Sequence, residues 1–160
     1  MPDRVALYPG SFDPVTRGHL DLIQRASRIF PRIIVAVATN NAKSCLFSVD
    51  ERLDLLRSHT RDFANVDVAH FKGLTVDFAR EVGAVAIIRG LRVISDFEFE
   101  LSMAINNEKL NPNVDTVLLT PSEPYLYLSS RLVKELASYG GPVSHYVTPE
   151  VEALLRERLG

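Results

Sequence analysis

The chain has 160 residues, the size of one ordinary domain, and we predict that residues 1–160 form a single domain. Hydrophobic residues make up 46% of the chain and charged residues 24%, close to the globular average, which excludes disordered and fibrous classes. With 18 Lys and Arg against 20 Asp and Glu, the formal charge is −2, so nothing in the overall charge favours binding to nucleic acid or to an anionic membrane. A phosphate site would need a local cluster of positive groups.

The single cysteine, Cys45, has no partner for an internal disulfide, and no Cys and His spacing is typical of a zinc site. The first five residues include an acidic side chain and contain no apolar stretch of signal-peptide length. The longest purely apolar run, residues 33–38, is far shorter than the roughly 20 residues that span a bilayer. We therefore expect a soluble, cytoplasmic protein.

Five short apolar runs predict strands over residues 5–8, 33–38, 66–71, 84–88 and 116–119. The second and fourth runs are apolar on consecutive residues and rich in β-branched side chains. This pattern is typical of strands that are buried on both faces, as in a parallel sheet.

The segments between these runs have helical periodicity, and several have recognisable ends. The first helix begins near His19, and Ser48 with Glu51 forms a capping box at the start of the second. A short helix over residues 74–82 ends at Gly83, which tolerates the left-handed conformation. Later helix starts are predicted at a capping box of Ser95 with Glu98, at Ser129 or Ser130, and at Thr148 before Pro149.

Alternating strands and helices predict an α/β fold, a Rossmann-like doubly wound parallel sheet of about five strands with flanking helices. The order of the strands is left open. In such sheets, ligands bind beyond the carboxyl ends of the strands. The loops at that edge supply His19, Lys43, Arg89 and Arg92, together with hydroxyl groups and helix N-termini. We therefore predict an anion site there.

The standard phosphate-binding motifs are absent from the sequence. The eight glycines form neither G-x-G-x-x-G nor G-x-x-x-x-G-K followed by Ser or Thr. A hydride-transfer enzyme of the usual Rossmann kind is therefore disfavoured.

His19 follows Gly18 at a helix N-terminus, where unpaired N–H groups and the helix dipole favour bound anions. A histidine there can donate a hydrogen bond to a phosphoryl oxygen as charge shifts in the transition state. The alternative is an exposed histidine with no such role.

Arg89 and Arg92 flank Gly90 after a buried run and suit multidentate binding of phosphate, and the alternative is an ion pair with Asp96 or Glu100. Three further sets of residues have structural alternatives. Lys43 can be solvated, Ser129 and Ser130 can be N-caps, and Phe12, Tyr125 and Tyr127 can be packing residues rather than stacking partners of a base.

Three segments together resemble one family. Residues 8–14 (YPGSFDP) followed by 16–19 (TRGH) resemble the nucleotidyltransferase superfamily that carries the H/T-x-G-H motif. Residues 88–92 (IRGLR) with 96–100 (DFEFE), and residues 128–134 (LSSRLVK), resemble bacterial phosphopantetheine adenylyltransferases in particular. The resemblance extends over essentially the whole chain and implies the fold of this superfamily.

The resemblance implies transfer of the adenylyl group of ATP to 4′-phosphopantetheine, which gives dephospho-coenzyme A and pyrophosphate in the penultimate step of coenzyme A synthesis. It also implies Mg²⁺ with the triphosphate, a homohexamer and feedback inhibition by coenzyme A. Because the attacking phosphate is already anionic, direct in-line attack needs no general base and no covalent enzyme intermediate. No pair of carboxylates stands out as a metal site, so we expect water and ATP phosphates to supply most of the metal's ligands.

Carried over by position, the resemblance assigns catalysis to His19, Lys43 and Arg89, and acceptor binding to Ser11, Lys43, Thr75 and Arg89. It assigns ATP binding to Ser11, Phe12, His19, Gly90, Leu91, Arg92, Glu100, Tyr125, Leu126, Tyr127, Leu128, Ser129, Ser130 and Arg131. Two of these positions depart from the family pattern. Ser11 stands where Thr is usual, and Arg131 replaces a small hydroxyl residue.

Two other functions fit the residues. A related adenylyl- or cytidylyltransferase would act on another phosphate acceptor such as nicotinamide mononucleotide. A regulatory nucleotide-binding domain would bind ATP without turnover.

Overall fold

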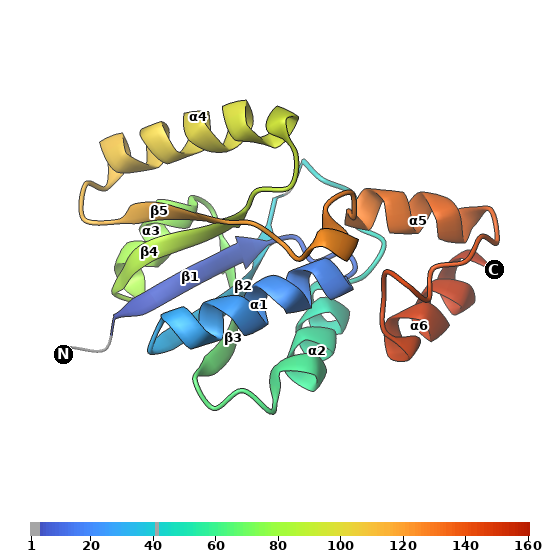
Figure 1. Cartoon of the computed structure of the whole chain (residues 1–160). Coiled ribbons are helices and arrows are strands. Elements are labelled where there is room, and N and C mark those ends of the chain that lie inside the picture. Colours follow the sequence, from blue (N-terminus) through green and yellow to red (C-terminus); the bar gives the residue numbers. More distant parts are fainter. Residues whose placement is uncertain (1–3, 41) are drawn as a thin grey trace.

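Five parallel strands form one sheet at the centre of the molecule (Figure 1). The computed structural model describes residues 4–40 and 42–160. The strands are β1 (Val5–Gly10), β2 (Arg32–Thr39), β3 (Val66–Lys72), β4 (Ala84–Gly90) and β5 (Asp115–Leu119). Their order is β3-β2-β1-β4-β5, and every neighbouring pair is parallel. The predicted parallel α/β sheet is confirmed, and β1 lies at its centre.

Helices cover both faces of the sheet (Figure 1). They are α1 (Arg17–Ile29), α2 (Val49–Thr60), α3 (Thr75–Glu81), α4 (Ile94–Leu110), α5 (Ser130–Ser138) and α6 (Pro149–Leu159), with a short 3-10 turn, η1 (Glu123–Tyr125). Helices α1 and α2 lie on one face and α3 and α4 on the other, while α5 and α6 lie beyond the carboxyl ends of the strands. No helix among the described residues is long and apolar enough to cross a membrane.

The consecutive apolar residues of β2 divide between two cores. Ile33, Val35 and Val37 pack into the larger core, with residues of α1, α2, α5 and α6. Ile34 and Ala36 point the other way into a smaller core that includes residues of α3. Successive side chains of a strand point to opposite faces, so a strand covered on both sides must be apolar at every position.

Most of the predicted helix ends are confirmed. Ser48 and Glu51 form the expected capping box, in which each side chain accepts a hydrogen bond from the other residue's N–H. Ser129 caps α5 and Thr148 caps α6 through their hydroxyl oxygens. Gly83 follows α3 with φ of 68°.

The predicted capping box of Ser95 and Glu98 is wrong. Helix α4 begins at Ile94, so Ser95 lies within its first turn. The carboxylate of Asp96 accepts from the N–H of Val93 at 3.4 Å and takes the place assigned to Glu98. The prediction selected Glu98 where the structure uses Asp96, because a helix that begins at either position has an acidic residue in its first turn.

Helix α4 packs on the sheet differently from the other helices. All of its residues are described, and Glu100 is the one that is buried. The helix instead exposes large apolar side chains, namely Ile94, Phe97, Phe99, Leu101, Met103, Ile105 and Leu110. Large apolar side chains exposed together on one helix favour an interaction surface there.

Removal of a core side chain on β4 tests the packing. Ile88 is fully buried, whereas Val85 on the same strand is 41% exposed. We expect Ile88→Ala to lower the free energy of unfolding by about 2–5 kcal/mol, because the substitution leaves a cavity. Val85→Ala is the matched control and should cost about 1 kcal/mol or less. Urea unfolding measures both, and equal losses would contradict the burial described here.

Candidate active site

A cleft of about 350 Å³ opens at the carboxyl ends of the central strands. Its walls come from the segment after β1, the start of α1, the end of β4 and the segment that leads into α5. The chain crosses from one side of β1 to the other between β3 and β4, which makes the β1–β4 boundary the switch point of the sheet. Ligands of doubly wound folds bind at this point. The structure therefore has a cavity at the edge predicted for the anion site.

His19 is held at the start of α1 by Thr16, the N-cap residue. The N–H of Thr16 donates to Nδ1 of His19 at 3.0 Å, and Oγ1 of Thr16 accepts from the N–H of His19 at 3.3 Å. A ring nitrogen that accepts from a backbone N–H carries no proton, so the neutral ring has its proton on Nε2. The sequence reasoning gave Thr16 no role, although a hydroxyl three residues before His19 is the signal of an N-cap.

Burial, followed by the positive charges of Arg92 and Arg89, lowers the pKa of His19 from 6.5 to about 4. The ring is therefore neutral at physiological pH. With Nδ1 engaged by Thr16, the group that His19 can offer to a ligand in the cleft is the Nε2–H donor.

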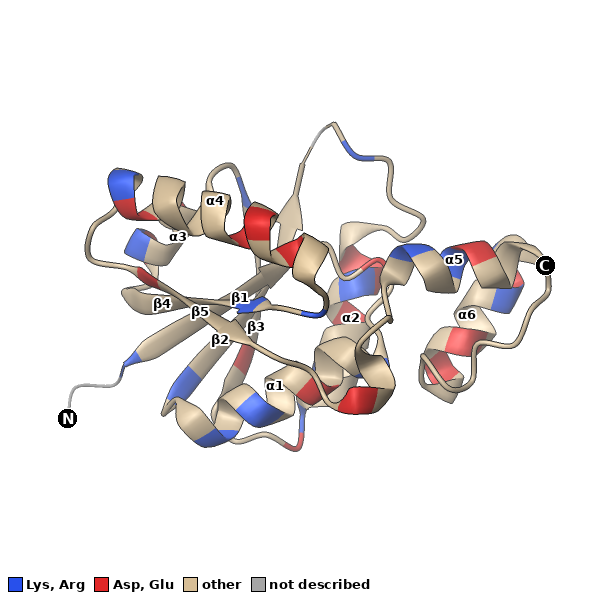
Figure 2. Ribbon diagram, turned by 45° about the horizontal axis from the view of Figure 1, so that its top comes forward, with Lys and Arg blue, Asp and Glu red and all other residues tan. Residues whose placement is uncertain are grey.

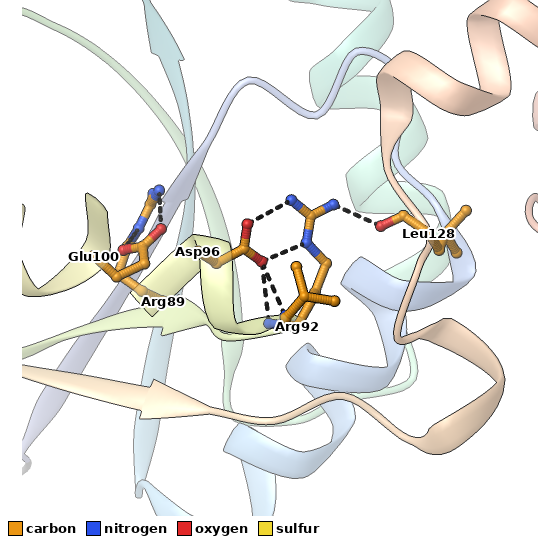
Figure 3. Close-up of polar contacts among 6 residues, drawn as sticks. Arg89, Arg92, Asp96, Glu100 and Leu128 are labelled. Carbon is orange, nitrogen blue, oxygen red and sulfur yellow. Dashed lines mark hydrogen bonds and ion pairs between the residues drawn. The ribbon is translucent and has the colours of Figure 1, made fainter. Parts of the chain in front are cut away.

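Arg89 is both an ion-pair partner and a lining residue of the cleft (Figure 3). Its Nε donates to Oε2 of Glu100 at 2.9 Å and its Nη2 donates to Oε1 at 3.0 Å. Burial alone would lower the pKa of Arg89, but the hydrogen bonds to Glu100 and its charge outweigh that effect and raise the pKa. The ion pair with Glu100 that the sequence left open is therefore present, and phosphate binding by Arg89 stays a prediction.

Arg92 connects two walls of the cleft (Figure 3). Its Nε donates to Oδ2 of Asp96 at 3.1 Å, and its Nη1 donates to the carbonyl of Leu128 at 2.7 Å. The second contact ties the loop after β4 to the segment that precedes α5.

A buried carboxylate, Asp13, joins three parts of the site. It is 4% exposed and accepts hydrogen bonds from the N–H groups of Leu46 and Phe47 and from Nζ of Lys134, each at 2.9 Å. Burial would raise the pKa of Asp13, but the N–H groups of Phe47 and Leu46 and the Lys134 ammonium outweigh it and lower the pKa. The sequence reasoning missed this role, because a contact across 121 residues leaves no periodic signal.

The sequence of the chain matches known proteins over almost its full length. Residues 7–136 match the family model described as cytidylyltransferase-like. A phosphopantetheine adenylyltransferase of Caldanaerobacter subterraneus subsp. tengcongensis is 54% identical over 155 residues, which cover 97% of both chains. One of Moorella thermoacetica is 52% identical over 157 residues and 98% of both chains. The chain belongs to the phosphopantetheine adenylyltransferase family.

Solved structures of low sequence identity share the fold. The nicotinic acid mononucleotide adenylyltransferase of Plasmodium falciparum superimposes with a TM-score of 0.70 at 14% identity, covering 97% of this chain and 95% of that one. At this identity the likeness concerns the fold alone, which is the nucleotidyltransferase fold predicted from the sequence.

Most residues that the family resemblance singled out border the cleft. They are Ser11, Phe12, His19, Lys43, Thr75, Arg89, Gly90, Arg92, Glu100, Tyr125, Leu128, Ser129 and Ser130. Phe12 is 2% exposed, and its ring packs edge-on against Tyr8 and His19, so the packing alternative holds for this ring in the structure. The roles assigned to these residues in phosphopantetheine adenylyltransferases stay predictions for this chain.

Four predicted ATP-binding residues lie outside the cleft lining. They are Leu91, Leu126, Tyr127 and Arg131. The N–H of Leu91 donates to the carbonyl of Leu119 at 2.9 Å, and Tyr127 is 83% exposed beside a separate groove near the start of α4.

The side chains around the cleft suit phosphate better than a resident metal ion. Among the described residues, no group of three or more His, Cys, Asp and Glu side chains could hold a metal. The nearby carboxylates are engaged by cations, Glu100 by Arg89 and Asp13 by Lys134. Arginine, lysine and histidine N–H groups are donors for phosphoryl oxygens.

The protonation state of His19 can be measured by NMR of the free protein. We expect a pKa of about 4 with the neutral proton on Nε2, because the ring is largely shielded from water and the charges of Arg92 and Arg89 oppose its protonation. Between pH 6.5 and 4 the unfolded chain then binds a proton at this position that the folded chain does not. This difference makes stability fall as the pH falls through that window. A His19→Asn variant assigns the resonance, and titration above pH 6 would contradict the structure.

Proposed function

We propose that this protein transfers the adenylyl group of ATP to 4′-phosphopantetheine and forms dephospho-coenzyme A and pyrophosphate. The observation that carries the proposal is the 54% identity to a phosphopantetheine adenylyltransferase over 97% of both chains. The cleft supports it with a neutral histidine donor and an arginine and a lysine from two other segments.

The chemistry requires two anions to be held in line. The acceptor phosphate is its own nucleophile, so the site needs no general base. Lys43 and Arg89 offset the charge of the acceptor phosphate, and Ser11 and Thr75 add hydroxyl groups beside them. Orientation of two bound reactants lowers a barrier by roughly 7–11 kcal/mol, which makes positioning the main task of the site.

His19 stabilises the phosphoryl group that moves. Its Nε2–H donates to a nonbridging oxygen of the α-phosphoryl, where negative charge shifts in the transition state. Because the ring is neutral, this donor is present across the physiological pH range. The N-terminus of α1, where His19 lies, adds backbone N–H groups and a favourable dipole.

ATP enters as its magnesium complex, as the substrate. The triphosphate and water supply the oxygen ligands that Mg²⁺ prefers. Gly90, Arg92, Tyr125 and residues 128–130 hold the nucleotide, and Ser11 and Phe12 contact it from the loop after β1.

Helix α4 provides the surface for self-association. Its exposed apolar side chains, among them Phe99 at 60% exposure, suit burial between copies of the chain in a homohexamer. Sedimentation equilibrium should give the mass of six chains. Phe99→Lys should shift that mass downward, whereas Arg57→Gln, at an exposed position on α2, should leave it unchanged. A monomeric wild type would contradict the proposed homohexamer.

The proposal also includes a cytoplasmic location and inhibition by coenzyme A, the product of the pathway.

The decisive test is pyrophosphate release from magnesium ATP with 4′-phosphopantetheine and, in parallel, nicotinamide mononucleotide. We expect turnover with phosphopantetheine alone. Turnover with the mononucleotide alone would overturn the acceptor assignments at Lys43, Thr75 and Arg89. ATP binding without turnover would favour a regulatory domain.

His19→Ala tests the role of the donor. The loss of one preorganised donor to a phosphoryl oxygen should lower kcat about 100- to 1,000-fold. His145→Ala is the matched control, since His145 is exposed and lies outside the cleft lining. Near wild-type turnover of His19→Ala, with an unchanged circular dichroism spectrum, would contradict the assignment.

A further inference from the structure

The segment between β2 and α2 carries Lys43 into the cleft. The N–H of Lys43 donates to the carbonyl of Asn40 at 3.0 Å. Three residues after Lys43, Leu46 begins the part of the segment that is fastened to the rest of the molecule. The position of Lys43 therefore depends on how Leu46 is held.

The backbone of Leu46 is held from two sides. Its N–H donates to Oδ2 of Asp13 at 2.9 Å, on the side of the cleft. Its carbonyl accepts from Nη1 of Arg158 at 2.8 Å. The same guanidinium lies 5.3 Å from the ring centroid of Phe47 and pairs with Glu51 in the first turn of α2. One side chain thus contacts Leu46, Phe47 and Glu51.

Arg158 belongs to a helix that is itself firmly packed. Val151 and Leu155 of α6 are fully buried in the larger core. At the start of α6, the hydroxyl of Thr148 lies 2.7 Å from Nε2 of His59 on α2. Helix α6 lies beyond residues 7–136, the part of the chain that matches the family model.

We propose that Arg158 is a positioning residue for the anionic acceptor, which acts by fixing the segment that carries Lys43. This inference rests on the proposed function, because it needs Lys43 to bind the acceptor phosphate. Without the hydrogen bond from Arg158, the hydrogen bonds that fasten this end of the segment are those from the N–H groups of Leu46 and Phe47 to Asp13. The segment is then held from one side, and Lys43 samples more positions in the cleft. The acceptor then binds more weakly, while the ATP side of the cleft is unaffected.

The expected effect is moderate, because the Arg158 side chain is 41% exposed. Loss of one partly exposed, charge-assisted hydrogen bond should raise KM for 4′-phosphopantetheine about three- to tenfold in Arg158→Ala. KM for ATP and kcat should stay within about twofold of wild type.

Arg156→Ala is the matched control on the same helix. Arg156 pairs with Glu152 and donates to the carbonyl of Gly141, each at 3.2 Å, and it has no hydrogen bond or ion pair to residues 46–51. It should lose as much helix stability as Arg158→Ala without the change in acceptor KM. Equal KM values in the two variants would overturn the proposal.

The double variant with Lys43→Ala separates positioning from a general loss of stability. If Arg158 acts through Lys43, Arg158→Ala should raise the acceptor KM in the wild type but add no further rise in Lys43→Ala. If the two substitutions raise the acceptor KM independently, so that their effects are fully additive in free energy, the proposal is overturned. Calorimetric binding of phosphopantetheine to the wild type is measured beside these variants. If the wild type neither binds nor turns over the acceptor, the proposed function and this inference are overturned together. If the wild type does both but Arg158→Ala has an unchanged acceptor KM, this inference alone is overturned.

Discussion

The charge on Asp13 is the constraint on which the cleft depends. A buried carboxylate is costly unless its oxygens are paired, and the three donors to Asp13 come from two remote segments of the chain. The segment of Leu46 and Phe47 and the helix of Lys134 must therefore both be in place when the loop after β1 is buried. Formation of one wall of the cleft requires the others, so the site assembles together with the fold.

Carboxylates also organise the positive charge of the site. Glu100 holds the guanidinium of Arg89, and Asp96 holds that of Arg92, so the cations are oriented without an excess of positive charge in the chain. In the view of Figure 2, Lys and Arg lie among Asp and Glu on most helices. The local field still acts, because Arg92 and Arg89 help to keep His19 neutral. A chain with a net charge of −2 thereby gains a cleft suited to phosphates.

The sequence predicted what depends on local pattern and on motifs. Consecutive apolar residues in β2 predicted burial on both faces, and the strand–helix alternation predicted the edge at which His19, Lys43 and Arg89 meet. The sequence could not predict the strand order or the hydrogen bond from Lys134 to Asp13, because contacts between residues far apart in the chain leave no periodic pattern in the sequence. The start of α4 was misplaced for a different reason, since several acidic residues near Ser95 offered similar caps.

The C-terminal part of the chain supports both the start of α1 and the segment that carries Lys43. The N–H of Arg17, at the start of the helix that carries His19, donates to the carbonyl of Tyr146 at 2.8 Å. The segment of Lys43 is held through Leu46 by α6. His19 and Lys43, to which the proposed function assigns the donor to the α-phosphoryl and the cation for the acceptor, are thus both tied to the C-terminal part of the chain. In-line transfer is sensitive to displacements of about 1 Å, so under the proposed function a shared support helps to keep the two bound reactants aligned.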